Sequence, residues 1–248
     1  MTKVRSIFIT DVGSKRAKNQ DNGLASPEYG FCVIADGMGG HRGGETASRI
    51  AVEKQSESLI GPSHGKHMPE RMIEGLRRAH DSIYQMSQEN ESLRGMGTTS
   101  TFLALDDARN PSEAWITHVG DSRCYLVKPG AIWQLTRDHS MVQEKLRAGL
   151  ITREQLKTDV MRNVITRSVG FELQLDPDLY HLDVSVNDLF LLCSDGLTGQ
   201  IEDQEILKVV DECRPSRDWE ECARQLITLA NERGGDDNIS VGILEIGD

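Results

Sequence analysis

The most constraining feature of the sequence is an apolar run at residues 33–36 that ends abruptly in an aspartate followed by glycines. Asp36 is the acid, and Gly37 follows it without a side chain, so a backbone carbonyl can approach an ion or a phosphate closely. A single Asp-Gly pair after a strand is typical of a turn. The same pattern recurs elsewhere in the chain, which favours a shared site over isolated turns.

Further acids stand where other apolar runs end or begin. Asp195 ends a second run and is followed by glycine, and Asp121 ends a weaker third run. Asp237 precedes the last apolar run, and Asp21 lies in the first loop. Carboxylates at the ends of several strands can share one rim, and hard divalent ions prefer such oxygen ligands. Asp21 also suits a loop-capping turn, and Asp236, beside Asp237, suits a solvated surface position.

Alternating apolar patterns separate strands from helices along the chain. Strands are expected at residues 7–13, 30–35, 97–105, 114–119, 123–127, 132–135, 179–184, 189–193 and 239–246. Helices are expected at residues 43–59, 72–86 and 203–213, with short helical pieces at 141–148 and 153–156. The last helix is expected to begin at Ser216 as its N-cap. The four strands between residues 97 and 135 are expected to form one antiparallel meander.

Two groups of strands, each accompanied by a pair of helices, predict an α+β fold. Its layers would be α-β-β-α, with two antiparallel sheets face to face and helices outside. No linker divides residues 1–248, so we expect a single domain. Residues 138–167 are highly charged with little apolar content, and we expect this excursion to form a flap over the rim.

The composition excludes several classes of protein. A net charge of −11 disfavours nucleic acid as a partner, since such binding draws on lysine and arginine. No apolar run is long enough to span a membrane, and no signal peptide is visible, which predicts a cytoplasmic protein. The five cysteines show no Cys-x-x-Cys spacing and suit a reducing compartment.

The order of these motifs resembles that of the metal-dependent serine/threonine protein phosphatases of the PP2C family, in its bacterial form. The resemblance runs from Asp11 to about Val241. It rests on seven motifs in register, with the two ends of the flap counted as one motif. The motifs are 16–21, 36–37, 97–99, 120–123, the flap ends 138–140 with 162–167, 195–196 and 234–238. The α-β-β-α sandwich is also the architecture of this family.

The resemblance implies a role for each motif. Two core Mn²⁺ or Mg²⁺ ions would be held by acids and one carbonyl, and a hydroxide bridging them would attack the phosphate. The implied metal ligands are Asp21, Asp36, the carbonyl of Gly37, Asp195 and Asp237, with Asp121 for a third ion. Asp121 could instead pair with Arg123 and cap a turn.

The resemblance also implies that Arg16 binds the phosphate, because a guanidinium can grip two oxygens at once. Lys15, Lys18 and Arg42 compete with it for this role. Two positions depart from the family. Met38 stands where eukaryotic members carry a proton-donating histidine, and Gln20 replaces a frequent glutamate.

The function that follows is hydrolysis of phosphoserine and phosphothreonine in proteins, opposing a eukaryotic-like bacterial Ser/Thr kinase. We expect a monomer with no nucleic-acid or membrane partner. One alternative is a pseudophosphatase that acts as an interaction module, which would lack metal-binding acids. Another is a metal-dependent hydrolase of small phosphate esters, which would use the same site.

Overall fold

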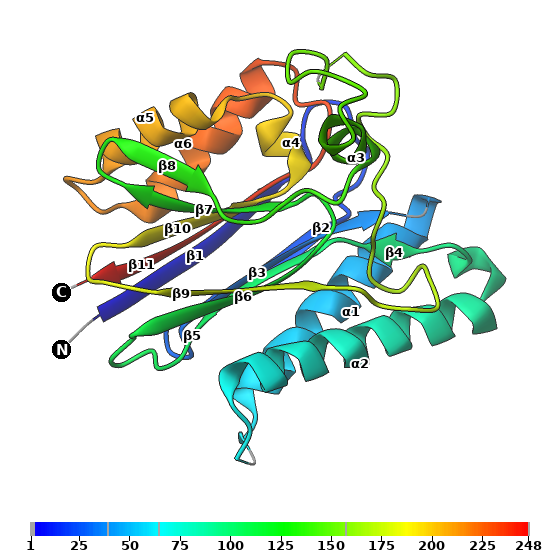
Figure 1. The fold of residues 1–248 in the computed structure, drawn as a ribbon, viewed down its shortest axis with the longest axis horizontal. Helices are drawn as coiled ribbons and strands as arrows, with labels where there is room; N and C mark the ends of the chain where they lie inside the picture. Colours follow the sequence, from blue (N-terminus) through cyan, green and yellow to red (C-terminus); the bar gives the residue numbers. More distant parts are fainter. Residues whose placement is uncertain (1–2, 39, 64, 157, 248) are drawn as a thin grey trace.

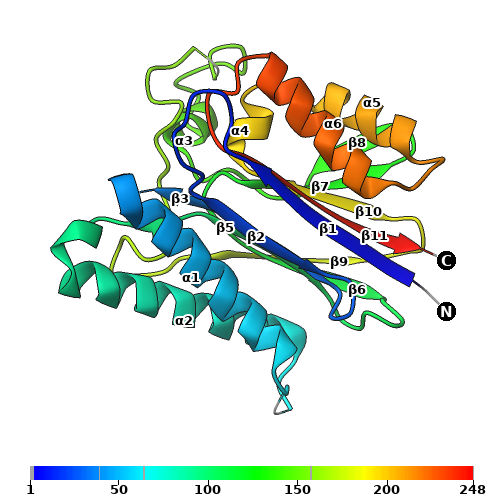
Figure 2. The ribbon, with the colours of Figure 1, turned by 180° about the vertical axis from the view of Figure 1, so that it is seen from behind.

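The computed structural model describes residues 3–38, 40–63, 65–156 and 158–247, with the backbone alone for residues 40–42. Two antiparallel sheets lie face to face, and a pair of long helices covers the outer face of each sheet (Figures 1 and 2). The predicted α-β-β-α sandwich is therefore confirmed. Every helix in the described ranges is too short or too polar to cross a lipid bilayer.

The first sheet has the strand order β1-β11-β10-β7-β8. Its strands are β1 (Lys3–Asp11), β11 (Ile239–Gly247), β10 (Leu189–Cys193), β7 (Arg123–Lys128) and β8 (Ala131–Gln134). Helices α5 (Asp203–Cys213) and α6 (Trp219–Glu232) cover its outer face. The short helix α4 (Asp195–Thr198) follows β10 directly.

The second sheet has the order β2-β3-β5-β6-β9, and β4 also pairs with β3. Its strands are β2 (Asp21–Ser26), β3 (Phe31–Met38), β4 (Gly97–Thr98), β5 (Ser100–Leu105), β6 (Glu113–Val119) and β9 (Asp178–Asp183). Helices α1 (Gly40–Ile60) and α2 (Met68–Glu89) cover it, and the 3-10 helix η1 (Glu91–Leu93) follows α2.

The central strands are apolar without alternation because both of their faces are buried. In β3, Phe31 and Val33 face the helices α1 and α2, whereas Cys32 and Ile34 face the other sheet. Strand β10 repeats this arrangement in the first sheet, with its odd-numbered residues toward α5 and α6. A strand that is buried on both faces reaches solvent only at the edge of the sandwich. The acid at the end of such a strand therefore lies at that edge.

The expected meander is wrong, because its strands belong to two sheets. Strands β5 and β6 lie in the second sheet, and β7 and β8 lie in the first. The chain crosses between the sheets at Gly120, whose φ of 109° is accessible to glycine. A Cβ at Gly120 would lie 2.5 Å from Thr99 Cγ2. The crossing leaves Asp121 at the junction of the two sheets.

Two local expectations also need correction. The N-cap of α6 is Asp218, whose side chain accepts a hydrogen bond from the Glu221 N–H, and Ser216 instead donates to the carbonyl of Cys213. Residues 153–156 form turns rather than a helix, whereas α3 (Met141–Arg147) is present as expected.

Close approach of the two sheets depends on glycine at their interface. A Cβ on Gly242 of β11 would lie 2.5 Å from Cys32 Sγ of β3, and a Cβ on Gly23 of β2 would lie 2.3 Å from the Phe8 ring of β1. Cys32 is fully buried and Phe8 is partly buried, so an added methyl at either position would have to displace its neighbour. The spacing of the sheets, and with it the rim, therefore depends on these small residues.

We predict that Gly242→Ala lowers the free energy of unfolding by about 1–3 kcal/mol, because the added methyl overpacks the sheet interface. Cys32→Ala removes the sulfur that the new methyl would meet, so the double variant should recover part of this loss. Urea denaturation of the two single variants and the double variant measures the coupling between the two positions.

The matched control is Gly130→Ala, at a turn with φ 74° and no atom within 4 Å of the added Cβ. Its cost comes from the backbone alone and should not change when Cys32 is replaced. If the effects of the Gly242 and Cys32 substitutions on the free energy of unfolding simply added, the sheets would separate freely at this point.

Candidate active site

Five predicted acids meet at one edge of the sandwich, which we call the carboxylate rim and define as Asp21, Asp36, Asp121, Asp195 and Asp237. They come from the start of β2, the end of β3, the β6–β7 crossing, the start of α4 and the loop before β11. Asp21 and Asp36 are direct partners in the β2–β3 ladder. The negative charges of Asp21, Asp195, Asp121 and Asp237 all raise the pKa of Asp36, which shows how closely the five acids gather.

Burial makes the mutual repulsion of these acids strong. Loss of hydration is the largest cause of the raised pKa of Asp36, and the neighbouring carboxylates add to it. Burial likewise raises the pKa of Asp121 well above its ordinary range, with Asp195 as the next cause. The pKa of Asp21 rises to about 6, although hydrogen bonds from Ser240 and Ser194 oppose the rise. Positive charge at the rim would relieve this strain.

The donor atoms suit a hard divalent cation. Asp21 Oδ1 and Asp195 Oδ1 are buried and accept no hydrogen bond from any described residue. A buried carboxylate oxygen without a partner is costly unless a cation compensates it. The five rim residues are all aspartates, and carboxylate oxygens are the ligands that Mg²⁺ and Mn²⁺ prefer. The rim residues therefore fit either ion.

Arg16 also reaches the carboxylate rim. Its Nη2 lies 2.6 Å from Asp237 Oδ2, and this ion pair is the main cause of the raised pKa of Arg16. Smaller contributions come from Asp195 and Asp36. The Arg16 side chain is 52% exposed, so the guanidinium remains accessible from solvent. Of its competitors, Arg42 has a side chain outside the described residues.

Gly37 is held tightly against its neighbours. Its N–H donates to the Gln20 carbonyl, and a Cβ would lie 2.1 Å from the Gly44 carbonyl oxygen of α1. The close packing of β3 against α1 therefore requires glycine here. Met38, the next residue, ends β3 opposite Gly97 of β4.

The alternative in which Arg123 pairs with Asp121 is wrong. Arg123 is directed to Asp138, with Nε 3.0 Å from Oδ1 and Nη2 2.7 Å from Oδ2. Tyr125 Oη lies 3.1 Å from Arg123 Nη1, and Gln134 donates to Asp138. Asp121 thus keeps its carboxylate for the rim, while a buried ion pair ties β7 to the start of the flap.

Several supporting residues were not singled out from the sequence. Ser194 and Ser240 each donate to Asp21 Oδ2 over 2.7 Å, and thereby fix this carboxylate between the sheets. Asn238 donates from Nδ2 to the carbonyls of Val12 and Lys18 and so holds the loop that carries Arg16. The available signals were the position of Ser194 directly before Asp195 and of Asn238 directly after Asp237.

Glu113, His181 and Asp183 form a separate group with ligand atoms within 4.8 Å of one another. It lies at the far end of β6 from the carboxylate rim, because Glu113 begins the strand that leads to Asp121. These side chains are largely exposed, and His181 stacks on Trp115. The group plays no part in the site at the rim.

Comparison with known proteins places this geometry in context. The family model described as protein phosphatase 2C matches residues 5–239. The protein phosphatase PhpP of Streptococcus pneumoniae is 36% identical over 244 residues, which cover 96% of each chain. The Mycobacterium tuberculosis serine/threonine phosphatase PstP/Ppp superposes with a TM-score of 0.89 at 29% identity, covering 100% of both chains. A structure of the PstP catalytic domain in complex with 2 manganese ions superposes with a TM-score of 0.85 at 29% identity, also covering 100% of both chains.

We predict that Asp36→Asn stabilises the metal-free protein by about 1 kcal/mol, because it removes one charge from a buried repulsive cluster. A carboxyl whose pKa is raised by folding loses stability as pH rises through that pKa, so the gain should be largest at high pH. Thermal unfolding in EDTA measures the gain. Added Mn²⁺ should raise the melting temperature of the wild type much more than that of the variant.

Asp236→Asn is the matched control, since Asp236 is exposed and accepts a hydrogen bond from Gln200. Its stability in EDTA and its response to Mn²⁺ should resemble those of the wild type. A destabilised Asp36→Asn protein with a full response to Mn²⁺ would contradict this description of the rim.

Proposed function

Because this chain belongs to the protein phosphatase 2C family, we propose that the carboxylate rim is its active site. The protein is a metal-dependent serine/threonine phosphatase that uses Mn²⁺ or Mg²⁺. The observation that supports the rim as the site is its charge imbalance, in which buried acids repel one another and two carboxylate oxygens have no described partner. Binding of divalent cations resolves this imbalance.

We propose the following ligands for the metal ions, each provided by a residue of the rim or its edge. They are Asp21, Asp36, the carbonyl of Gly37, Asp195 and Asp237 for the core ions, and Asp121 for a third ion. Bound ions of this kind activate water as a nucleophile at neutral pH and neutralise phosphate charge. Ser194 and Ser240 keep Asp21 oriented, and Asn238 keeps the loop of residues 12–20 against the rim.

Arg16 is proposed to bind the phosphate of the substrate. In the structure one nitrogen contacts Asp237, so the guanidinium already lies at the rim while other N–H groups remain available. A planar guanidinium suits two oxygens of a phosphate. The same Asp237 contact orients Arg16 before the substrate arrives, which reduces the entropy lost on binding.

Residues 141–163 are proposed to act as a flap that shapes the choice of protein substrate. Its ends are fixed by two hydrogen bonds, from the Met141 N–H to the Val164 carbonyl and from the Thr166 N–H to the His139 carbonyl. Between these ends, Leu150 and Val160 are strongly exposed. A segment that is fixed at both ends and only lightly packed between them can adapt to a partner.

We propose phosphoproteins modified by a Ser/Thr kinase as the substrates, in the cytoplasm, with a single-domain monomer as the active form. The relatives named above are protein phosphatases, which favours phosphoproteins over small phosphate esters. A pseudophosphatase is not favoured, since all of the predicted acids are present at the rim. Met38 carries no ionisable proton, so it cannot protonate the leaving serine or threonine.

The proposed function predicts hydrolysis of a phosphothreonine peptide with added Mn²⁺ and none in EDTA. Asp195→Asn should lower kcat at least about 100-fold, because it removes a charge that holds metal. Asp121→Asn should retain two tightly bound ions and lose a weaker one. Calorimetric metal titration beside steady-state kinetics measures both effects, and full activity without metal would exclude this mechanism.

Arg16→Ala is expected to raise KM by about tenfold, because it removes charged hydrogen bonds to the phosphate. Metal affinity should change far less, since the guanidinium binds no ion. Lys15→Ala is the control, because Lys15 directly precedes Arg16 in the same loop and carries the same charge. Unchanged kinetics in Arg16→Ala would transfer the phosphate role to Lys15, Lys18 or Arg42.

A further inference from the structure

A large groove opens beside the carboxylate rim and has a volume of about 1070 Å³. Asp121 and Asp195 line it at the rim, α3 and the flap form one wall, and residues 198–204 form the opposite wall. It therefore continues from the proposed catalytic position toward the start of α5. A peptide whose phosphorylated residue lies at the rim could extend along it.

Four arginines line this groove. Arg123 binds Asp138, and the other three are Arg137, Arg153 and Arg162. These last three are exposed, and their guanidinium groups have no hydrogen-bond or ion-pair partner within the described ranges. Most other arginines of the chain do have such partners, as Arg167 does with Asp178 and Arg233 does with Glu205. In a chain with a net charge of −11, a group of unpaired cations in one groove is unusual.

The acids of the groove that lie away from the carboxylate rim have partners of their own. Asp138 binds Arg123 bidentately, and Asp203 accepts from Tyr125 Oη at 3.0 Å. Glu202 takes part in the capping box of α5, and a hydrogen bond from Thr152 lowers the pKa of Glu154. Among the described residues that line the groove away from the rim, the charged groups without a hydrogen-bond or ion-pair partner are therefore the three arginines.

We propose that this groove binds acidic residues that flank the phosphorylated residue, so that the enzyme prefers phosphoproteins with an acidic sequence around the site. This inference rests on the proposed function, and it identifies the class of substrate. Exposed guanidinium groups attract carboxylates or a second phosphate, and each can form a bidentate contact. The remaining acidic surface repels such a substrate, which makes the groove the favourable place for its acidic segment.

The test compares pairs of phosphothreonine peptides that differ only in their flanking residues. One peptide of each pair carries glutamates and the other carries glutamines. In one pair these residues precede the phosphothreonine, and in a second pair they follow it. The wild type should hydrolyse at least one acidic peptide with a higher kcat/KM than its neutral counterpart. Exposed ion pairs are individually weak, so we expect the preference to fall by about threefold for each arginine replaced by glutamine. In the triple variant Arg137→Gln/Arg153→Gln/Arg162→Gln it should disappear, and salt at about 1 M should remove it from the wild type.

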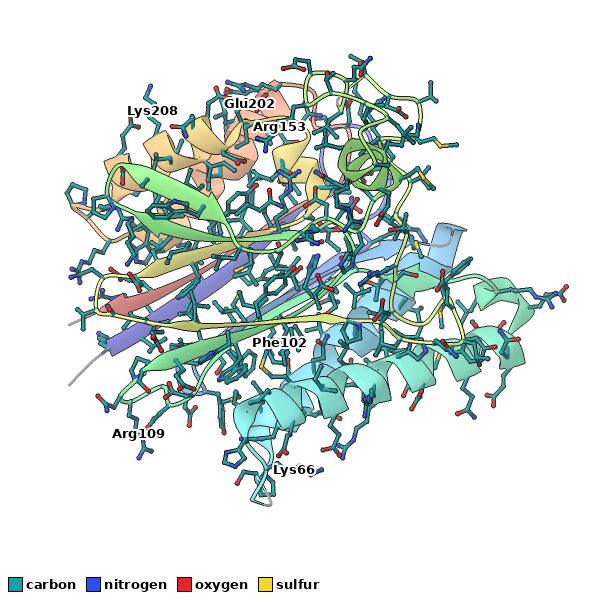
Figure 3. All side chains as sticks on the ribbon, viewed as in Figure 1. Lys66, Phe102, Arg109, Arg153, Glu202 and Lys208 are labelled. Carbon is teal, nitrogen blue, oxygen red and sulfur yellow. The ribbon has the colours of Figure 1, made fainter. Side chains whose placement is uncertain are left out.

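Arg109→Gln is the matched control, because Arg109 is also exposed and without a described side-chain partner but lies far from the groove. Figure 3 labels Arg153, which belongs to the flap, and Arg109 near the opposite end of the molecule. This control changes the net charge by as much as each single groove substitution does, and it should keep the preference. Replacing the groove arginines by lysine should retain most of it.

The measured quantity is a ratio of two substrates on one preparation, so partial loss of folded enzyme does not affect it. Mn²⁺-dependent hydrolysis of all peptides without a charge preference would overturn the inference and leave the proposed function intact. An equal loss of preference in Arg109→Gln would also overturn it, since net charge would then be the cause. Absence of Mn²⁺-dependent hydrolysis on every peptide would instead contradict the proposed function.

Discussion

The repulsion among the buried acids of the carboxylate rim is the constraint on which the rest of this structure depends. Asp36 lies among four other carboxylates in a desolvated position, and burial together with mutual repulsion raises the pKa of both Asp36 and Asp121. Free energy from elsewhere in the fold must offset that cost when no cation is bound. The layered apolar core around both sheets supplies it, and the same uncompensated charge is the basis of the proposed affinity of the rim for divalent ions.

The sandwich architecture explains why the acids meet at one edge. Strands β3 and β10 are buried on both faces, so polar groups can follow them only where the strands leave the core. Asp36 and Asp195 occupy those positions in facing sheets, and Gly242 against Cys32 allows the sheets to approach. The crossing at Gly120 then brings Asp121 to the same edge.

The sequence predicted those parts of the fold and the site whose residue pattern has a single physical explanation. A continuous apolar run that ends in Asp-Gly predicted both Asp36 and Asp195, and helical spacing predicted the covering helices. The path between strands was not predictable in this way, since β6 and β7 look equally suited to one meander or to two sheets. The partner of Arg123 was equally hidden, because Asp121 lies two residues away in the sequence and nothing in the sequence indicated Asp138 instead. Ser194 and Ser240 became recognisable only once three distant segments were seen around Asp21.

The acids of the rim and the arginines of the groove act differently on an approaching phosphoprotein. The carboxylate rim repels a dianionic phosphate, so the proposed function requires metal binding before productive substrate binding. Arg16 cannot substitute for those cations, because its ion pair with Asp237 neutralises one acid of the five. The unpaired arginines of the groove lie outside this balance and keep their charge whether or not metal is bound. On the proposals above, they attract the flanking segment of a substrate independently of the rim, while the rim and its ions bind the phosphate itself.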